Sequence, residues 1–174
     1  MSTHNNFIPI NIAVVTISDT RILDNDKSGD VLEDRVLKSN HKIISRDIVK
    51  DDFEEIYELF SNLINNEKID VIISTGGTGL TGRDITPEVM KKLFEKTIDG
   101  FGEMFRWLSY SKIGTSSLQS RALAGVSNGT YIFCLPGSPS ACRDGWDQIL
   151  IHQLDIRHKP CNFVEIMPRL QEHK

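Results

Sequence analysis

The sequence predicts an α/β fold of three layers, in which a mostly parallel sheet is covered by helices on both faces. Short runs rich in β-branched residues alternate with amphipathic helical segments along the chain, and such alternation is typical of parallel sheets. Two glycine segments directly follow such runs, where open sheets of this kind bind their ligands. The chain of 174 residues, 39% hydrophobic and 25% charged, favours a single domain over residues 1–174.

Four runs predict buried strands. Asn11–Ser18 is rich in β-branched residues, which suits a strand buried on both faces. Lys42–Val49 is less apolar and is expected nearer an edge of the sheet. Ile69–Thr75 runs straight into the first glycine segment, and Thr130–Leu135 runs into the second.

Two helices are expected in the first half of the chain. Apolar residues within Val31–Leu37 predict one helix, with a cap near Ser28. A clearer apolar stripe, at i, i+3, i+4, i+7 and i+8 from Ile56, predicts the next helix. Asp51 or Asp52 can cap that helix, because an acid follows each of them three residues later and can complete a capping box.

The second half of the chain predicts further helices. Thr86-Pro87-Glu88 is typical of a helix start, with a cap, a proline at the first position and then an acid. Gly100 is expected to break the chain before a helix over 101–110, and a shorter helix is expected after Ser116 or Ser117. Ser138-Pro139 opens the last long helix. The core is placed at about residues 10–154, and the tail over 155–174 has little periodicity.

Composition excludes several classes of protein. A net charge of −4 and a pI near 5.7 argue against a dedicated nucleic-acid binder, which needs a basic surplus. No apolar run approaches the roughly 18 residues that span a bilayer. Met1–Ile10 lacks the features of a secretory signal, and the three cysteines form no Cys-x-x-Cys pair. We therefore expect a cytoplasmic protein with reduced thiols and no membrane partner.

The first glycine segment, Thr75–Asp84, carries the features of an anion site. Its glycines permit positive φ and let backbone N–H groups converge on one anion. Three threonine hydroxyls add donors, and the Arg83 guanidinium matches phosphate geometry. An acid such as Asp84 fits beside phosphate if a Mg²⁺ ion lies between the carboxylate and the phosphate oxygens.

Two other interpretations of this segment stay open. Gly77-x-Gly79-x-x-Gly82 matches a dinucleotide fingerprint, but there the helix should begin at the glycines, and here it is signalled only at Thr86. A P-loop is excluded because no Gly-Lys-Ser/Thr follows. A purely structural glycine turn is the plainer alternative, although three hydroxyls, an arginine and an aspartate exceed what a turn needs.

The second glycine segment, Leu135–Ser140, leaves a strand and enters a helix whose first N–H groups can bind an anion. The alternative is a simple proline-shaped helix cap. For the Asp26–Gly29 stretch, the alternative to a functional role is a solvated loop. For Asp51, the alternative is the helix cap described above. Ser120-Arg121 can supply anion donors or cap a helix. Two anion loops at one sheet edge predict a ligand with phosphate at separated points.

These motifs together resemble the molybdopterin-binding family of molybdenum cofactor biosynthesis, which includes the molybdopterin adenylyltransferases. The resemblance covers about Ile10–Leu154. The segments that carry it are Thr16–Asp19, Asp26–Gly29, Thr75–Glu88, Leu118–Ala122 and Leu135–Ser138. Three further segments resemble one branch of the family, namely Phe101–Arg106, Ile113–Ser116 and Lys159–Phe163.

The resemblance implies the three-layer molybdopterin-binding fold, assembled as a trimer or a dimer of trimers. Active relatives bind molybdopterin and Mg-ATP, join AMP to the molybdopterin phosphate and release pyrophosphate. Two loop aspartates of that reaction, which also are the expected Mg²⁺ ligands, match Asp51 and Asp84. The implied contacts to pterin phosphate and nucleotide are Ser18, Asp19, Ser28, Gly29, Thr75, Gly76, Gly77, Thr78, Gly79, Ser120, Arg121, Pro136, Gly137 and Ser138.

Two functions are therefore carried forward. The first is Mg²⁺-dependent transfer of AMP to molybdopterin, which needs positioning and charge compensation and no side-chain nucleophile. The second is a non-catalytic molybdopterin-binding or carrier oligomer in the same pathway. A nicotinamide-dependent oxidoreductase is the remaining alternative. The presence of both Asp51 and Asp84 favours catalysis, because a simple binder gains nothing from carboxylates that repel phosphate.

Overall fold

The computed structural model describes residues 6–173 and contains one sheet in the order β2-β1-β3-β6-β5-β4. The prediction that Met1–Ile10 holds no secretory signal falls partly on residues 1–5, outside this range. The strands are β1 (Asn11–Ile17), β2 (Lys42–Val49), β3 (Val71–Thr75), β4 (Lys96–Thr97), β5 (Leu123–Ser127) and β6 (Thr130–Leu135). The pairs β1–β2, β1–β3 and β3–β6 are parallel, whereas β5 runs antiparallel to both β6 and β4. The predicted mostly parallel sheet is confirmed.

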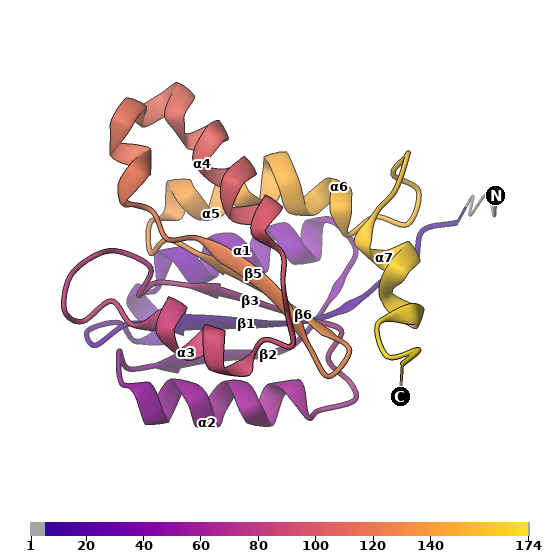
Figure 1. The fold of residues 1–174 in the computed structure, drawn as a ribbon, viewed down its shortest axis with the longest axis horizontal. Helices are drawn as coiled ribbons and strands as arrows, with labels where there is room; N and C mark the ends of the chain where they lie inside the picture. Colours follow the sequence, from indigo (N-terminus) through magenta and orange to yellow (C-terminus); the bar gives the residue numbers. More distant parts are fainter. Residues whose placement is uncertain (1–5, 174) are drawn as a thin grey trace.

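Helices cover both faces of the sheet, which confirms the three layers (Figure 1). One face carries α1 (Lys27–Lys38), α4 (Asp99–Ile113), α5 (Pro139–Gly145), α6 (Ile151–Gln153) and α7 (Phe163–Ile166). The other face carries α2 (Phe53–Ile64) and α3 (Thr86–Leu93). A π-helical turn over Trp146–Leu150 joins α5 to α6. No helix within residues 6–173 is both long enough and apolar enough to cross a membrane.

The central strands are apolar throughout because both of their faces are buried. In β1, Ile12 and Val14 pack into the core on the α1 side, whereas Ala13 and Val15 pack into the core on the α2 side. Successive side chains of a strand point to opposite faces, so a strand covered on both sides shows no polar alternation. β2 lies at the edge of the sheet, as its polar composition predicted, and most of its side chains are only partly buried.

Two strands, β4 and β5, were not predicted, whereas β6 matches the strand expected at Thr130–Leu135. β5 and β6 form a hairpin whose turn is Asn128-Gly129, with φ of 47° and 82°; this dipeptide is typical of two-residue hairpin turns and is a signal that was overlooked. β4 has only two residues and so carries no periodicity. The expected break at Gly100 is wrong, since Gly100 lies in the first turn of α4 and the chain instead changes direction at β4, which pairs with β5.

Candidate functional site

The carboxyl ends of β1, β3 and β6 open into a cavity of about 710 Å³. Parallel strands end at one edge of a sheet, so the loops that follow them meet there although they are far apart in the sequence. Helices α4 and α5 form the remaining wall. The predicted site residues that line the cavity are Ser18, Ser28, Thr75, Gly76, Gly77, Thr78, Gly79, Asp84, Ser120, Pro136, Gly137 and Ser138.

The glycines after β3 are required by close packing against the end of β1. Gly76 has φ of +107°, and a Cβ atom on it would lie 2.1 Å from the carbonyl oxygen of Ile17. The Thr86 hydroxyl donates to the carbonyl oxygen of Gly76 at 3.0 Å. The prediction that Thr86 caps α3 is therefore wrong, since the cap position is Ile85 and the Thr86 side chain instead fixes the glycine loop.

Asp84 is held inside the glycine segment by its neighbours. The Thr81 hydroxyl and the Thr81 backbone N–H both donate to its carboxylate, at 2.6 and 2.8 Å. Burial alone would raise the pKa of Asp84, but the bonds from Thr81 and from the Gly79 backbone outweigh it and lower that pKa. Asp84 is therefore a charged group in the cavity wall at neutral pH.

Asp51 is not the cap of α2. Asp52 takes that role, because its Oδ1 atom accepts hydrogen bonds from the backbone N–H groups of Glu54 and Glu55, both at 3.1 Å. The carboxylate of Asp51 instead faces the glycine segment, and a Cβ atom on Gly77 would lie 2.9 Å from its Oδ1. The sequence could not separate two adjacent aspartates that both suit a cap.

Electrostatics connect Asp51 with Asp84. Burial raises the pKa of Asp51, and the negative charges of Asp19 and Asp84 raise it further. The two predicted catalytic carboxylates, from the loops after β2 and β3, are therefore close enough to repel each other. Asp51 does not line the main part of the cavity but lies at its rim beside Gly77.

The guanidinium of Arg83 is bound to Asp19. Its Nε and Nη2 atoms donate to the two carboxylate oxygens at 2.9 and 2.8 Å, and this bond lowers the pKa of Asp19. The Asp19 carboxylate also accepts from the backbone N–H of Asp51 at 3.2 Å. The Arg83 guanidinium, which was expected to bind a phosphate, thus binds a carboxylate here. This ion pair connects the loop after β1 with the loop after β3.

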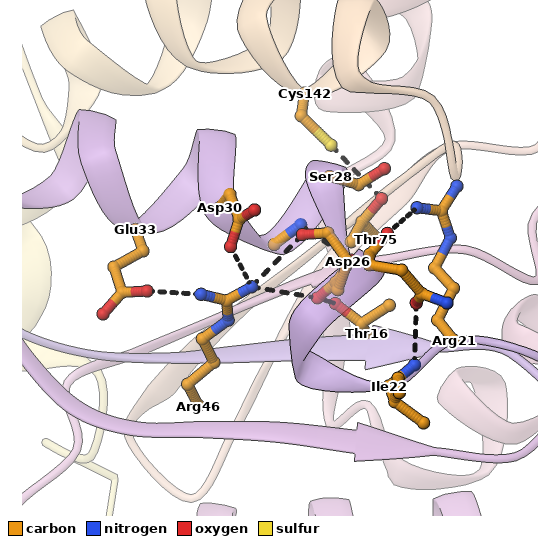
Figure 2. A network of polar contacts seen from close by, with 12 residues as sticks. Thr16, Arg21, Ile22, Asp26, Ser28, Asp30, Glu33, Arg46, Thr75 and Cys142 are labelled. Atoms are coloured by element: carbon orange, nitrogen blue, oxygen red, sulfur yellow. Dashed lines mark hydrogen bonds and ion pairs between the residues drawn. The ribbon is translucent and has the colours of Figure 1, made fainter.

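The Asp26 carboxylate, which Figure 2 shows within a network of polar contacts, is fully buried, so the solvated-loop interpretation of this stretch is wrong. It accepts hydrogen bonds from the Thr16 hydroxyl at 2.6 Å and from the Gly29 backbone at 3.0 Å, and it thereby caps α1. Arg46 bonds to it at 3.3 Å and also pairs with Asp30 and Glu33. The expected cap near Ser28 is therefore two residues earlier. Gly29 packs against this network and does not line the cavity.

Hydrogen bonds from two buried side chains hold the second glycine segment. The Ser28 hydroxyl donates to the carbonyl oxygen of Gly137 at 2.9 Å, and the Thr75 hydroxyl donates to that of Pro136 at 2.9 Å. Ser138 caps α5, since its hydroxyl accepts from the Ala141 backbone N–H at 3.2 Å. The helix-cap interpretation is thus confirmed, and the same segment also lines the cavity.

Arg121 braces the glycine segment and does not line the cavity. Its Nε donates to the carbonyl oxygen of Gly79 and its Nη2 to that of Asp84, both at 2.7 Å, and it pairs with Glu88. Its backbone N–H donates to Thr78 at 3.0 Å. An anion-donor role therefore stays a prediction for Ser120, which lines the cavity, whereas Arg121 supports the loop that carries Asp84.

Several lining residues were not predicted. They come from the loop after β1, from α4 and α5, and from the 3-10 turn over Gly114–Gln119, and no local pattern marks them, because only the packing of these segments beside the sheet edge exposes them to the cavity. They are Arg21, Phe105, Ser109, Lys112, Ile113, Gln119, Ser140, Ala141 and Asp144.

The carboxylates of Asp51 and Asp84 suit a magnesium ion only when a bound ligand and water complete the coordination shell of the ion. Within residues 6–173 no group of three or more histidine, cysteine or acidic side chains is placed to hold a metal ion. Mg²⁺ is commonly bound by one or two carboxylates together with phosphate oxygens and water. Asp51 and Asp84 offer hard oxygen donors beside bare glycine backbone, which fits a Mg²⁺ ion shared with a phosphate.

Most of the chain resembles known proteins. Residues 13–156 match the family described as "Probable molybdopterin binding domain". Molybdenum cofactor biosynthesis protein B of Escherichia coli (strain K12) is 46% identical over 157 residues, which cover 90% of this chain and 92% of that protein.

Solved structures show the same fold. A crystal structure of a molybdenum cofactor biosynthesis protein B superposes with a TM-score of 0.85 at 36% identity, covering 95% of this chain and 98% of the other. The tungsten cofactor synthesizing protein MoaB of Pyrococcus furiosus superposes with a TM-score of 0.74 at 32% identity, covering 95% and 96% of the two chains.

Proposed function

The chain belongs to the family of molybdopterin-binding domains of molybdenum cofactor biosynthesis, and from this premise we propose that it transfers AMP from Mg-ATP to the terminal phosphate of molybdopterin. The observation that carries the proposal is that two carboxylates lie against one glycine segment, Asp51 beside Gly77 and Asp84 beside Gly79, and that the charge of Asp84 raises the pKa of Asp51. Two carboxylates that repel each other weaken the binding of any bare anion. They are useful where a divalent cation accompanies the phosphates.

The size and lining of the cavity support a phosphorylated ligand. A volume of about 710 Å³ lies within the usual range for small-molecule sites, roughly 300–1,000 Å³. Glycine backbone and hydroxyl groups line one side, and Phe105 and Ile113 offer apolar surface on the other. Such a mixed lining suits a ligand with a ring system and phosphate groups.

The proposed reaction is a phosphoryl-type displacement. An oxygen of the molybdopterin phosphate attacks the α-phosphorus of ATP and forms a new P–O bond. The bond from that phosphorus to the oxygen bridging toward the β-phosphorus breaks, and pyrophosphate leaves with the electron pair. The protein supplies position through the backbone N–H groups and hydroxyls of its glycine segments. Mg²⁺ held by Asp51 and Asp84 would offset the charge of the phosphates.

A non-catalytic molybdopterin carrier is the second candidate. The observation that favours it is the Asp19–Arg83 ion pair, because the guanidinium expected to meet a phosphate is engaged by a carboxylate. A carrier needs the glycine segments but has no use for Asp51 and Asp84.

Self-association as a trimer or a dimer of trimers is part of the proposal. Helix α4 and the turn after it expose large apolar side chains, which include Met104, Trp107, Tyr110, Ile113 and Leu118. Large exposed apolar patches mark interaction surfaces, and a second copy of the chain would cover this one. Light scattering after size exclusion tests this, and we propose that the assembly acts in the cytoplasm.

The decisive experiment is incubation with molybdopterin, ATP and Mg²⁺, in which pyrophosphate release and adenylylated molybdopterin are measured together. We expect stoichiometric formation of both products. Asp84→Asn should abolish turnover while molybdopterin still binds. Pterin binding without pyrophosphate release by the wild-type protein would support the carrier, and unchanged turnover in Asp84→Asn would remove Asp84 from the mechanism.

A further inference from the structure

An ion pair crosses the wall of the cavity between two helices. The Lys112 ammonium on α4 lies 2.5 Å from Oδ1 of Asp144 on α5, and both residues line the cavity. The Gln148 side-chain amide also donates to that Oδ1 atom, at 3.5 Å. Neither Lys112 nor Asp144 belongs to the glycine segments, and neither makes a hydrogen bond or an ion pair with Asp19, Asp51 or Asp84 in the part of the chain that the structure describes.

The pair changes the charge balance of the cavity. Its charged lining residues are Arg21, Asp84, Lys112 and Asp144, so their formal charges cancel. Arg21 donates to the backbone carbonyl of Asn25 at 3.3 Å. Among the described residues that line the cavity, Lys112 is the only cation on the α4 side that can attract a ligand with several phosphate charges, and Asp144 competes with the ligand for it.

The ion pair is easily exchanged for another partner. The Lys112 side chain is 55% exposed, whereas that of Asp144 is 18% exposed. Water competes for the exposed ammonium, and this weakens the pair. Lysine is a compact charge on a flexible stem, so its ammonium can turn to a phosphate without a matching fork geometry. Asp144 keeps the Gln148 amide and solvent when the lysine leaves it.

We propose that Lys112 is a phosphate-binding residue of this cavity and that Asp144 is its competitor, which the phosphate of an entering ligand displaces. The inference rests on the proposed function, since it assumes a phosphorylated ligand in the cavity, and it adds the residue that receives a phosphate on the α4 side. Asp144 thereby reduces the affinity for weakly charged ligands, because only a ligand with enough negative charge replaces the carboxylate.

The alternative is that the ion pair simply joins α4 to α5. The two interpretations predict opposite patterns. A structural bridge loses stability equally when either partner is removed, and ligand affinity stays unchanged. A competitor pair shifts affinity in opposite directions, because removing Lys112 deletes the ligand contact whereas removing Asp144 releases the lysine and deletes a repulsive charge.

The test is calorimetric titration of inorganic pyrophosphate, with Mg²⁺ present, into the wild-type protein and its variants. We expect Lys112→Met to weaken binding about tenfold and Asp144→Asn to strengthen it about threefold. The double variant should bind better than Lys112→Met alone, because the unpaired carboxylate no longer repels the ligand. The matched controls are Arg35→Met and Asp147→Asn, which break the pair at 2.8 Å between α1 and the π-helical turn, away from the cavity. Both should bind like the wild type.

Equal affinity in Lys112→Met and wild type would overturn the inference, as would a shift in the same direction for both single variants. A wild-type protein that binds no pyrophosphate would also overturn it. The proposed function has a separate readout, since adenylylated molybdopterin can form normally while the Lys112 and Asp144 variants show no difference. Absence of adenylylated molybdopterin together with the opposite affinity shifts would leave Lys112 as a phosphate contact of a carrier.

Discussion

The carboxylate of Asp51 lies against the backbone of Gly77, so that a Cβ atom on that glycine would be 2.9 Å from Oδ1. Two loops that are separated in the sequence thus form one rim. The adjacent Asp52 is engaged in capping α2, which leaves Asp51 available to a ligand or metal ion. This division of roles between neighbouring acids leads to the first prediction.

Asp51→Asn and Asp52→Ala should affect different properties, the first catalysis and the second stability. Asp51→Asn removes a charge at the rim and is expected to lower kcat for adenylyl transfer at least about 100-fold, with little loss of stability. Asp52→Ala removes the α2 cap and should lower the unfolding free energy by about 1 kcal/mol while kcat stays unchanged. Urea denaturation and the pyrophosphate assay measure the two quantities. A large kcat loss in Asp52→Ala with a normal Asp51→Asn would reverse the assignment.

Gly77→Ala tests how closely the glycine segment packs. Gly77 has φ of +63°, and its new Cβ would lie 2.3 Å from the Thr86 hydroxyl oxygen. The strained backbone and this clash should cost about 2 kcal/mol of unfolding free energy and abolish ligand binding. Gly82→Ala is the control in the same loop, because nothing lies within 4 Å of its Cβ position. If both variants behave alike, close packing at Gly77 is not what the segment requires.

Asp26→Ala should be strongly destabilising. Its buried carboxylate accepts from Thr16 and Gly29 and pairs with Arg46, so its removal leaves buried donors without a partner and is expected to cost about 3 kcal/mol. Asp30→Ala removes an exposed partner of the same arginine and should cost about 0.5 kcal/mol. Chemical denaturation of both variants measures the difference, and equal costs would show that burial of Asp26 contributes nothing.

The buried His41 should make stability depend on pH. Burial lowers the pKa of His41 from 6.5 to about 4, an effect that Asp155 only partly offsets. Between pH 6.5 and about 4, His41 is therefore protonated in the unfolded chain but neutral in the folded protein. The unfolding free energy falls over this range as the pH is lowered, by up to about 3 kcal/mol.

His41→Asn provides the comparison. It keeps an acceptor for the Ile10 backbone N–H, which bonds to Nδ1 at 3.2 Å, but it does not titrate. Denaturation at pH 7 and pH 5 should show a smaller loss of stability in the variant than in the wild type. An identical loss in both proteins would mean that His41 is not the group responsible.

Local patterns were sufficient for the order of the layers and for the edge of the sheet at which the glycine segments lie. The spacing of apolar residues predicts the strand at Asn11–Ile17 and the helix at Phe53–Ile64. A strand buried on both faces is a continuous apolar run, and a helix buried on one face has an apolar stripe, so nearby residues suffice to recognise each. The direction of parallel strands then places both glycine segments at one edge of the sheet. The two-residue β4 and its pairing with β5 were missed because two residues carry no period.

The sequence by itself determined the α/β class and the glycine segments, because these depend on residue type and short spacing. The choice of Asp51 and Asp84 followed from the resemblance to the family, since spacing alone also suited a helix cap at Asp51, and it stays a prediction. Only the tertiary structure decided that Asp52 caps α2, that Arg121 braces the loop from outside the cavity, and that Lys112 meets Asp144 in its wall. The contacts of Arg121 and Lys112 join residues that are distant in the chain. The cap decides between two adjacent aspartates that suit it equally in sequence. These outcomes depend on how helices pack against the sheet, and this packing energy is shared among many side chains and is not marked by any local pattern.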